Sequence, residues 1–149
     1  MILSSEFKML STMEKVDVIH AILEDVYTKS PWSKRQIQAD LEKENTDYFF
    51  VYHEKEAVGF LAIEYLYGEL EITNIAVKSA FQNKGFGAAL LQQLLNKPEA
   101  VFLEVRASNH KGQAFYQKNG FQVVGERKNY YHDPIEDAVI MKREENNER

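Results

Sequence analysis

Cysteine is absent from the 149 residues of this chain, and proline occurs only three times. The lack of cysteine excludes disulfide bonds, thiolate metal ligands and a cysteine nucleophile. No apolar run reaches the roughly 18 residues that a membrane-spanning helix needs. The first six residues also lack a basic segment followed by an apolar one, the pattern of a secretory signal. We therefore expect a cytoplasmic protein without a membrane partner.

The charge balance excludes a further class of function. The formal net charge is −5, with 14 acidic and 7 basic side chains in residues 1–72 and 9 acidic and 11 basic side chains in residues 73–149. An acidic protein without clustered Lys and Arg is a poor ligand for nucleic acid, so we expect no direct nucleic-acid partner. The acidic half could attract a cationic partner, although two ordinary solvated faces explain the asymmetry equally well.

The length and the hydrophobic pattern predict one α/β domain spanning residues 1–149, with a charged tail at 142–149 that frays. Two capping-box pairs, Ser11 with Glu14 and Ser33 with Gln36, predict the starts of two helices. Two more helices are expected at 85–95 and 110–119. Strands are expected at 7–10, 48–53, 58–67, 70–77, 101–105, 121–124 and 138–141, with a tyrosine-rich loop at 129–134. This order predicts an antiparallel meander, then a βαβ unit, in a mixed sheet with helices on both faces.

A buried strand that ends at Val77 leads into a loop with two glycines, Gly85 and Gly87, where a helix begins. Glycines let consecutive backbone N–H groups point into one concavity, and a helix N-terminus adds partial positive charge. Such a loop can bind a pyrophosphate, although a plain loop before a helix has the same spacing. The sequence contains no Walker loop, and Leu90 stands where the dinucleotide fingerprint needs its third glycine.

The segment 82–87, Q-N-K-G-F-G, resembles the Q/R-x-x-G-x-G/A signature of the GNAT acetyltransferases, and the predicted element order is that of the same family. Further matches lie between residues 30 and 141. The sharpest of them is L-E-V-R-A-S-N at 103–109, which is similar to the RimI type, the ribosomal-protein-alanine N-acetyltransferases. The resemblance implies a GNAT fold, in which a mixed, mostly antiparallel central sheet is splayed in the middle.

The resemblance also implies acetyl-CoA as co-substrate. In the family, the strand that corresponds to 75–77 pairs with the pantetheine arm, the glycine loop binds the pyrophosphate, and Asn109 reaches the pantetheine or thioester end. This chain departs from many relatives by having Asn83 and Lys84 in place of a basic pair. The residues expected to bind acetyl-CoA are Ile75, Ala76, Val77, Gln82, Asn83, Lys84, Gly85, Phe86, Gly87, Ala88 and Asn109.

Two residues are candidates for the chemistry of acetyl transfer. Glu104 interrupts an apolar strand and should lie on the opposite face from Leu103 and Val105, partly removed from water. The resemblance implies that Glu104 is the general base and that Tyr116 serves the departing thiolate as acid or hydrogen-bond donor. An outward-facing strand glutamate and a helix aromatic that fills the core are the alternatives. Without a cysteine, the amine should attack the thioester directly in a ternary complex.

The acceptor is expected to be the N-terminal peptide of a small-subunit ribosomal protein, bound by a monomer or weak dimer. Trp32, Tyr130 and Tyr131 are expected in loops along its channel, with packing as their alternative role. The histidines at 20, 53, 110 and 132 have no metal-ligand spacing, so we expect no metal. Two other functions stay open: acetylation of a lysine or small amine, and non-catalytic sensing of acyl-CoA.

Overall fold

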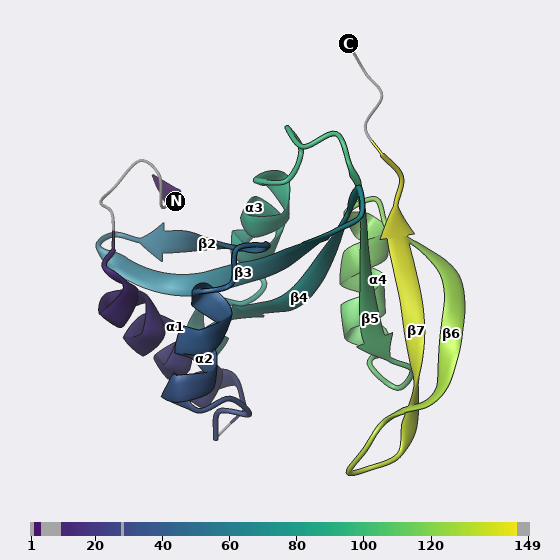
Figure 1. The fold of residues 1–149 in the computed structure, drawn as a ribbon, viewed down its shortest axis with the longest axis horizontal. Helices are drawn as coiled ribbons and strands as arrows, with labels where there is room; N and C mark the ends of the chain where they lie inside the picture. The colour runs from purple at the N-terminus through teal and green to yellow at the C-terminus, as the bar shows by residue number, and fades with distance from the viewer. Residues whose placement is uncertain (1, 4–9, 28, 146–149) are drawn as a thin grey trace. The chain divides into compact units, whose positions relative to one another are not determined.

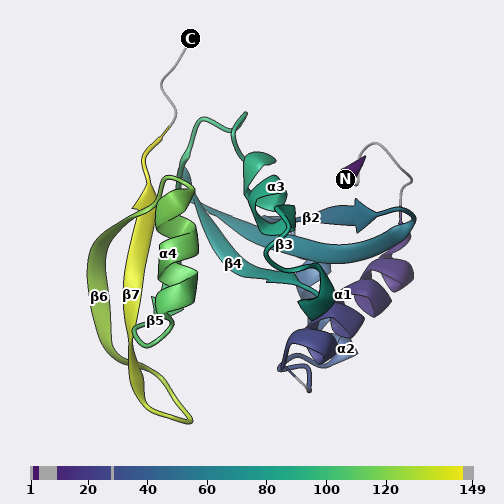
Figure 2. The ribbon, with the colours of Figure 1, turned by 180° about the vertical axis from the view of Figure 1, so that it is seen from behind.

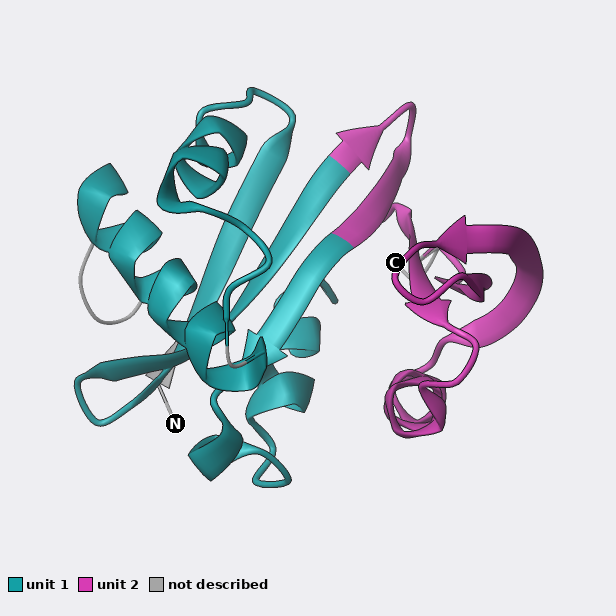
Figure 3. Cartoon of the chain, turned by 90° about the horizontal axis from the view of Figure 1, so that it is seen from below, with its two compact units in different colours: residues 1–64, 73–95 teal, residues 65–72, 96–149 magenta. Residues whose placement is uncertain are grey.

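The computed structural model describes residues 2–3, 10–27 and 29–145 (Figure 1). The chain divides into two compact units (Figure 3), of which unit 1 comprises residues 1–64 and 73–95 and unit 2 comprises residues 65–72 and 96–149. The expectation of a single domain stays a prediction. In the described part of the chain, no helix is both long and apolar enough to cross a membrane.

From residue 12 onward the elements follow the predicted order, whereas the first strand lies before the one expected at 7–10 and the sixth strand extends well past its predicted end at 124. Unit 1 contains β1 (Ile2–Leu3), α1 (Thr12–Tyr27), α2 (Lys34–Leu41), β2 (Thr46–His53), most of β3 (Glu56–Leu66) and β4 (Glu69–Val77), the 3₁₀ helix η2 (Ser79–Phe81) and α3 (Phe86–Gln92). Unit 2 contains the remaining ends of β3 and β4, β5 (Ala100–Arg106), α4 (His110–Lys118), β6 (Gln122–Tyr131) and β7 (Glu136–Arg143). Of the strand expected at 7–10, residues 7–9 lie outside the described residues.

The strands hydrogen-bond in the order β1-β2-β3-β4-β5-β7-β6. The pairs β1–β2, β2–β3, β5–β7 and β6–β7 are antiparallel, and β4–β5 is parallel. The mixed, mostly antiparallel sheet predicted from the sequence is therefore confirmed. The register of the parallel pair covers Glu69–Glu71 and Ala100–Phe102, and residues 73–77 of β4 belong to unit 1. An opening of the sheet beyond this register stays a prediction.

Both predicted capping boxes are present. The Glu14 backbone N–H donates to Ser11 Oγ at 3.2 Å, and Glu14 Oε1 accepts from the Ser11 backbone N–H at 2.9 Å. Ser33 and Gln36 repeat the arrangement at the start of α2, at 3.1 and 2.8 Å. Each box satisfies two backbone donors that a helix start would leave without partners.

Unit 1 buries its helices against both faces of its strands (Figures 1 and 2). Ile19, Ile22 and Leu23 of α1 are completely buried in a cluster with Phe60 of β3, on the side of α1 and α2. Fully burying such a side chain contributes about 1.5–3 kcal/mol. Strand residues alternate between faces, so Leu61 points toward the opposite side, where α3 lies. The expectation of helices on both faces is confirmed within unit 1.

Helix α3 is shorter than predicted. The sequence suggested 85–95, but Gly85 is the residue before the helix and the helix ends at Gln92. The backbone N–H groups of residues 93, 94 and 95 each donate to the carbonyl three residues earlier, at 3.2, 3.0 and 3.1 Å. The apolar period thus continues through Leu95 while the chain tightens into 3₁₀ turns, a change that the side-chain pattern alone does not reveal.

Unit 2 contains the strand that carries Glu104. Val101, Leu103 and Val105 of β5 are buried, whereas Glu104 and its alternate neighbours are only partly covered. The predicted alternation of β5 is therefore confirmed. At the other end of the chain, Lys142 and Arg143 were expected in a frayed tail but pair with β5 as the last residues of β7. Residues 146–149 of that expected tail lie outside the described residues.

The first half of the expected tyrosine-rich loop is strand. β6 continues to Tyr131, so Tyr130 and Tyr131 are strand residues and their placement in a loop was wrong. The register against β7 shifts between Arg127 and Tyr131, and Asn129 has a φ of 50°. A bulge of this kind lets Asn adopt left-handed backbone while the strand continues. The short connection to β7 begins only at His132.

Candidate active site

The residues predicted to act together fall into two groups, one in each unit. Unit 1 carries Trp32, the strand segment 75–77 and the loop segment 82–88. Unit 2 carries Glu104, Asn109, Tyr116, Tyr130 and Tyr131. The contacts within each group determine which part of a substrate its residues could bind.

The loop after β4 is held at several points before its glycines. The Lys78 backbone N–H donates to the Val58 carbonyl at 2.9 Å, and the Ser79 backbone N–H donates to Asp25 Oδ2 of α1 at 2.6 Å. Gln82 Nε2 donates to the Val77 carbonyl at 2.9 Å. The Gln82 amide therefore closes the loop onto the end of β4, which fixes the path of the chain that follows.

The next residues turn into α3 with left-handed backbone at Asn83 (φ 61°) and Gly85 (φ 91°). Asn tolerates this conformation and Gly adopts it without strain. Asn83, Lys84 and Gly85 are exposed, whereas the following residues 86–88 are buried or half-buried. The first N–H groups of a helix have no acceptor within it, so residues 86–88 present backbone donors beside an exposed lysine. This donor set fits a pyrophosphate. Because α3 has only seven residues, the hydrogen-bond donors matter more than the helix dipole.

Aromatic packing anchors both ends of the glycine loop. The ring of Phe81 lies 5.8 Å from that of Phe86, which is buried, and His53 of β2 lies 5.1 Å from Phe81 and 6.2 Å from Phe86. Lys84 Nζ lies 6.0 Å from the centre of the Phe81 ring. Sequence reasoning missed this role of His53, because no local pattern connects β2 with a loop about 30 residues later in the chain.

The backbone N–H and C=O groups of residues 75, 76 and 77 do not all point toward the same edge of β4. The Ala76 carbonyl oxygen lies 3.1 Å from where a Cβ on Gly59 of β3 would stand, so the polar groups of Ala76 face β3. Polar groups of alternate residues point to opposite edges of a strand, so those of Ile75 and Val77 point away from β3. The Val77 carbonyl already accepts from Gln82. Pairing with pantetheine would therefore rest on Ile75 and on the Val77 N–H.

Trp32 lies in the connection between α1 and α2 and is half-buried against the core of unit 1. Its backbone is fixed by Ser30, whose hydroxyl donates to the Trp32 carbonyl at 2.6 Å and lies 3.2 Å from the Trp32 N–H. Packing is thus part of its role. Its place in an acceptor channel stays a prediction.

Glu104 is the most enclosed charged side chain among the candidates, with 10% of its side chain exposed. Its Oε2 contacts Nε of Arg127 in β6. The expected partial removal from water is confirmed. The guanidinium offsets the carboxylate charge, so this largely covered anion has a cationic partner.

Tyr130 and Tyr131 form the wall beside this carboxylate. Their rings meet edge to face at 5.1 Å, and the Arg127 guanidinium lies 5.7 Å from the Tyr130 ring centre. The hydrogen bond to Glu104, followed by burial, raises the pKa of Tyr130. Burial, followed by the charge of Glu104, raises the pKa of Tyr131 to about 12. Both therefore stay protonated at neutral pH and can donate hydrogen bonds.

Tyr116 lies in α4, half-buried, with its ring 5.3 Å from Phe115 and 5.8 Å from Phe121. It therefore has a packing role. Asn109 precedes the same helix, and its Oδ1 accepts from the Gly112 N–H at 2.8 Å, which confirms the predicted N-cap. The proposed contacts of both residues with acetyl-CoA stay predictions. In the described ranges, no group of three or more His, Cys, Asp or Glu side chains could hold a metal ion.

The comparison with known proteins decides the family. The model of the acetyltransferase (GNAT) family matches residues 16–121. This chain belongs to the GNAT family. The match covers the helices and strands of unit 1 that carry the glycine loop, and it continues through β5 and α4. The resemblance to the GNAT acetyltransferases seen in segment 82–87 is therefore confirmed, and enzymes of this family use acetyl-CoA.

Full-length relatives support the same assignment within the GNAT family. A Bacillus subtilis relative is 35% identical over 135 residues, 87% of this chain and 89% of the relative. The [ribosomal protein bS18]-alanine N-acetyltransferase of Escherichia coli is 32% identical over 140 residues, 89% and 94% of the two chains. The crystal structure of the E. coli ribosomal-protein-S18-alanine N-acetyltransferase has a TM-score of 0.80 to this chain at 28% identity, covering 95% and 92%. A GNAT acetyltransferase from Elizabethkingia anophelis with acetyl-CoA bound has a TM-score of 0.65 at 27% identity, covering 75% and 83%.

Proposed function

We propose that this GNAT enzyme transfers the acetyl group of acetyl-CoA to the α-amine of the N-terminal alanine of ribosomal protein bS18. The observation that carries this proposal is the 32% identity to the E. coli bS18-alanine N-acetyltransferase over 94% of that protein. The enclosed Glu104 adds to it, because an amine acceptor needs a proton acceptor nearby.

Unit 1 supplies the features for holding acetyl-CoA. In this proposal the N–H groups of 86–88 bind the pyrophosphate, with Lys84 as the adjacent cation, while Gln82, Asn83 and Gly85 shape the loop. Ile75 and the Val77 N–H pair with the pantetheine arm, and backbone N–H groups of the same strand stabilise charge on the thioester oxygen. Ala76 contributes through packing, since it is buried in the core of unit 1.

Acetyl-CoA supplies the acetyl group as a thioester, and the acceptor nitrogen forms the new amide as the thiol departs. The α-amine has a pKa of about 7.7–8.0, so deprotonating it at pH 7 costs about 1 kcal/mol, against about 4–5 kcal/mol for a lysine. Glu104 takes the amine proton, directly or through water. Tyr116 donates a proton or a hydrogen bond to the sulfur, and Asn109 contacts the thioester end.

Unit 2 also supplies the aromatic side chains for the acceptor. Tyr130 contacts Arg127, the cationic partner of Glu104, and Tyr131 packs on Tyr130, so a peptide N-terminus that reaches Glu104 would contact this pair. Trp32 of unit 1 is proposed to contact the same peptide. The acidic surplus of residues 1–72 favours a cationic peptide, because a field of opposite sign accelerates encounter.

The test measures release of free CoA with a peptide that reproduces the N-terminus of bS18. The control peptide has the same sequence with its α-amine blocked, and free lysine and a polyamine serve as competing amines. The proposal predicts turnover with the free N-terminus and loss of most turnover when it is blocked. Equal turnover of both peptides would indicate a lysine acetyltransferase, and no turnover with any amine would indicate an acyl-CoA sensor.

A further inference from the structure

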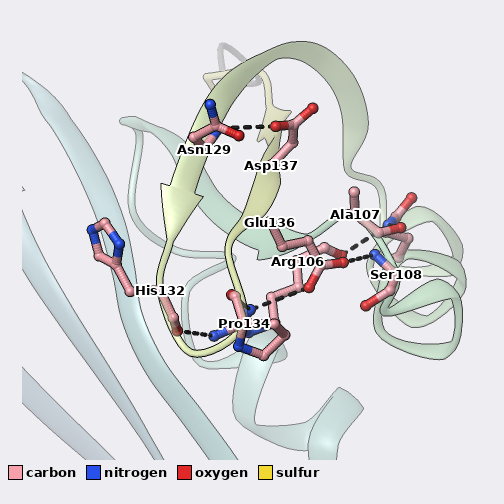
Figure 4. A network of polar contacts seen from close by, with 9 residues as sticks. Arg106, Ala107, Ser108, Asn129, His132, Pro134, Glu136 and Asp137 are labelled. Carbon is pink, nitrogen blue, oxygen red and sulfur yellow. Dashed lines mark hydrogen bonds and ion pairs between the residues drawn. The ribbon is translucent and has the colours of Figure 1, made fainter.

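Arg106 lies two residues after Glu104 in β5, so both side chains lie on the same face of the strand. Its guanidinium reaches the connection between β6 and β7 (Figure 4). Nη1 donates to the Pro134 carbonyl at 3.1 Å and Nη2 donates to the His132 carbonyl at 3.2 Å. Nη1 also lies 3.2 Å from Oε1 of Glu136. One side chain therefore binds three points of one short turn.

The same guanidinium lies against the tyrosine pair. Its central carbon is 4.4 Å from the centre of the Tyr131 ring, a distance typical of a cation–π contact. Tyr131 packs edge to face on Tyr130, whose ring centre lies 5.7 Å from the Arg127 guanidinium, and Arg127 contacts Glu104. A continuous set of contacts thus runs from Arg106 through both tyrosines and Arg127 to the proposed base.

Glu136 extends these contacts to the segment that follows β5. Its Oε2 accepts from the Ser108 backbone N–H at 2.5 Å, and the neighbouring Ala107 N–H donates to the Asp137 carbonyl at 3.0 Å (Figure 4). Ser108 directly precedes Asn109, the cap of α4. Glu136 has 17% of its side chain exposed, and Arg106 has 34%. Both side chains are therefore partly covered, and their ion pair is a charge-assisted hydrogen bond, which is stronger than a neutral one.

We propose that Arg106 is a positioning residue that sets the acceptor side of the site, by fixing the 132–136 turn and Tyr131 relative to Glu104. The inference rests on the proposed function, since it takes Glu104 as the base and the tyrosines as the acceptor wall. Arg suits this position because its planar fork can bind two carbonyls and a carboxylate at once, whereas Lys presents a single point charge. Replacing Arg106 should therefore weaken peptide binding more than acetyl-CoA binding.

The experiment compares wild type, Arg106→Lys and Glu136→Gln in the CoA-release assay, with KM measured separately for the bS18 peptide and for acetyl-CoA. Lys keeps the charge but loses the fork, so KM for the peptide should rise about tenfold, as expected for the loss of hydrogen bonds from a charged group. KM for acetyl-CoA should stay within about twofold. Glu136→Gln should change KM for the peptide in the same direction but less, because Arg106 keeps its carbonyl partners.

Lys142→Gln is the matched control, because it removes a cation from another ion pair of unit 2, with Glu69 at 3.3 Å. It should leave both KM values unchanged. Backbone hydrogen exchange at 132–136 supplies a readout that does not need turnover, and it should accelerate in Arg106→Lys and not in Lys142→Gln. If Arg106→Lys does not fold, Glu136→Gln provides the test with both readouts.

Equal rises of the two KM values, or faster exchange without a change in peptide KM, would overturn the inference and leave Arg106 a purely structural residue. Unchanged exchange and unchanged KM values would overturn it as well. The proposed function fails separately, if wild type releases no CoA with the peptide.

Discussion

Nε of Arg127 in β6 contacts Oε2 of Glu104 in β5, although β7 lies between the two strands and 23 positions separate the residues in the chain. Glu104 pairs with Ile140 of β7, and Arg127 pairs with Ala138 of the same strand. The proposed base is therefore a largely covered carboxylate with a cationic partner.

Arg127→Gln should lower kcat at neutral pH. Without the guanidinium, the Glu104 carboxylate loses the cation that offsets its charge and holds it in place. Measuring kcat with both substrates saturating gives the effect. Lys142→Gln, which removes a cation from the same unit, should leave kcat unchanged. An unchanged kcat in Arg127→Gln would show that this contact does not influence the reaction.

Glu104→Gln should lower kcat by about 10²–10⁴ at neutral pH, because the amide cannot accept the amine proton. Activity should recover partly at high pH, where the acceptor amine is already neutral. Gln keeps the shape of the side chain, so the thermal unfolding midpoint serves as a check that unit 2 is intact. Turnover equal to wild type at pH 7 would remove Glu104 from the mechanism.

Tyr116→Phe should lower kcat more than it lowers the affinity for acetyl-CoA. The ring contacts with Phe115 and Phe121 can persist in the variant, and only the hydroxyl is lost. Single-turnover kinetics and calorimetric titration with acetyl-CoA separate the two effects. Weaker acetyl-CoA binding with unchanged kcat would instead make Tyr116 a binding residue.

Gly112→Ala should destabilise the start of α4. A Cβ at this position would stand 2.6 Å from Nδ2 and 2.9 Å from Cγ of Asn109, so the capping side chain must move. Loss of an N-cap costs about 1 kcal/mol, measurable by urea unfolding. Gly125→Ala is the control, because its Cβ would meet only Ile140 Cδ1, at 3.7 Å. Equal stability of the two variants would contradict the close packing of Asn109 on Gly112.

Acid should weaken the contacts that Glu136 and Asp137 make at the end of the 132–136 turn. The hydrogen bond from Ser108 holds the pKa of Glu136 below 4.5, and the backbone hydrogen bond from Asn129 holds the pKa of Asp137 below 3.8. Groups whose pKa is lowered by folding stabilise the protein above their unfolded values, and this stabilisation is lost as the pH falls through the folded ones. Glu136→Gln should thus be less stable than wild type near neutral pH, and the difference should shrink in acid. A difference in urea midpoint that does not change with pH would contradict this role.

Local features were predictable because they depend on neighbouring residues. Both capping boxes, the Asn109 cap and the face of β5 that carries Glu104 follow from spacings of one to three residues. The Arg127 contact was not predictable, because it depends on the register of β6 against β7. That register shifts between Val123 and Gly125, and although a glycine within a strand can mark a bulge, it does not give the register of the pairing.

Asn129 shows a similar limit. Asn129, Asp133 and Pro134 favour turns, and the sequence therefore suggested a loop from 129. In the structure Asn129 takes left-handed backbone within β6, and Asp137 of β7 accepts its N–H at 2.8 Å. Pairing with β7 thus overrides the local turn preference, and it places both tyrosines beside Glu104.

Mass spectrometry of intact bS18 after incubation with acetyl-CoA and this enzyme locates the product. We expect a single added acetyl group, mapped by fragmentation to the α-amine of the N-terminal alanine and missing when Glu104→Gln replaces wild type under the same conditions. Acetylation confined to lysine side chains, or bS18 left unmodified by an enzyme that binds acetyl-CoA, would contradict the proposed activity.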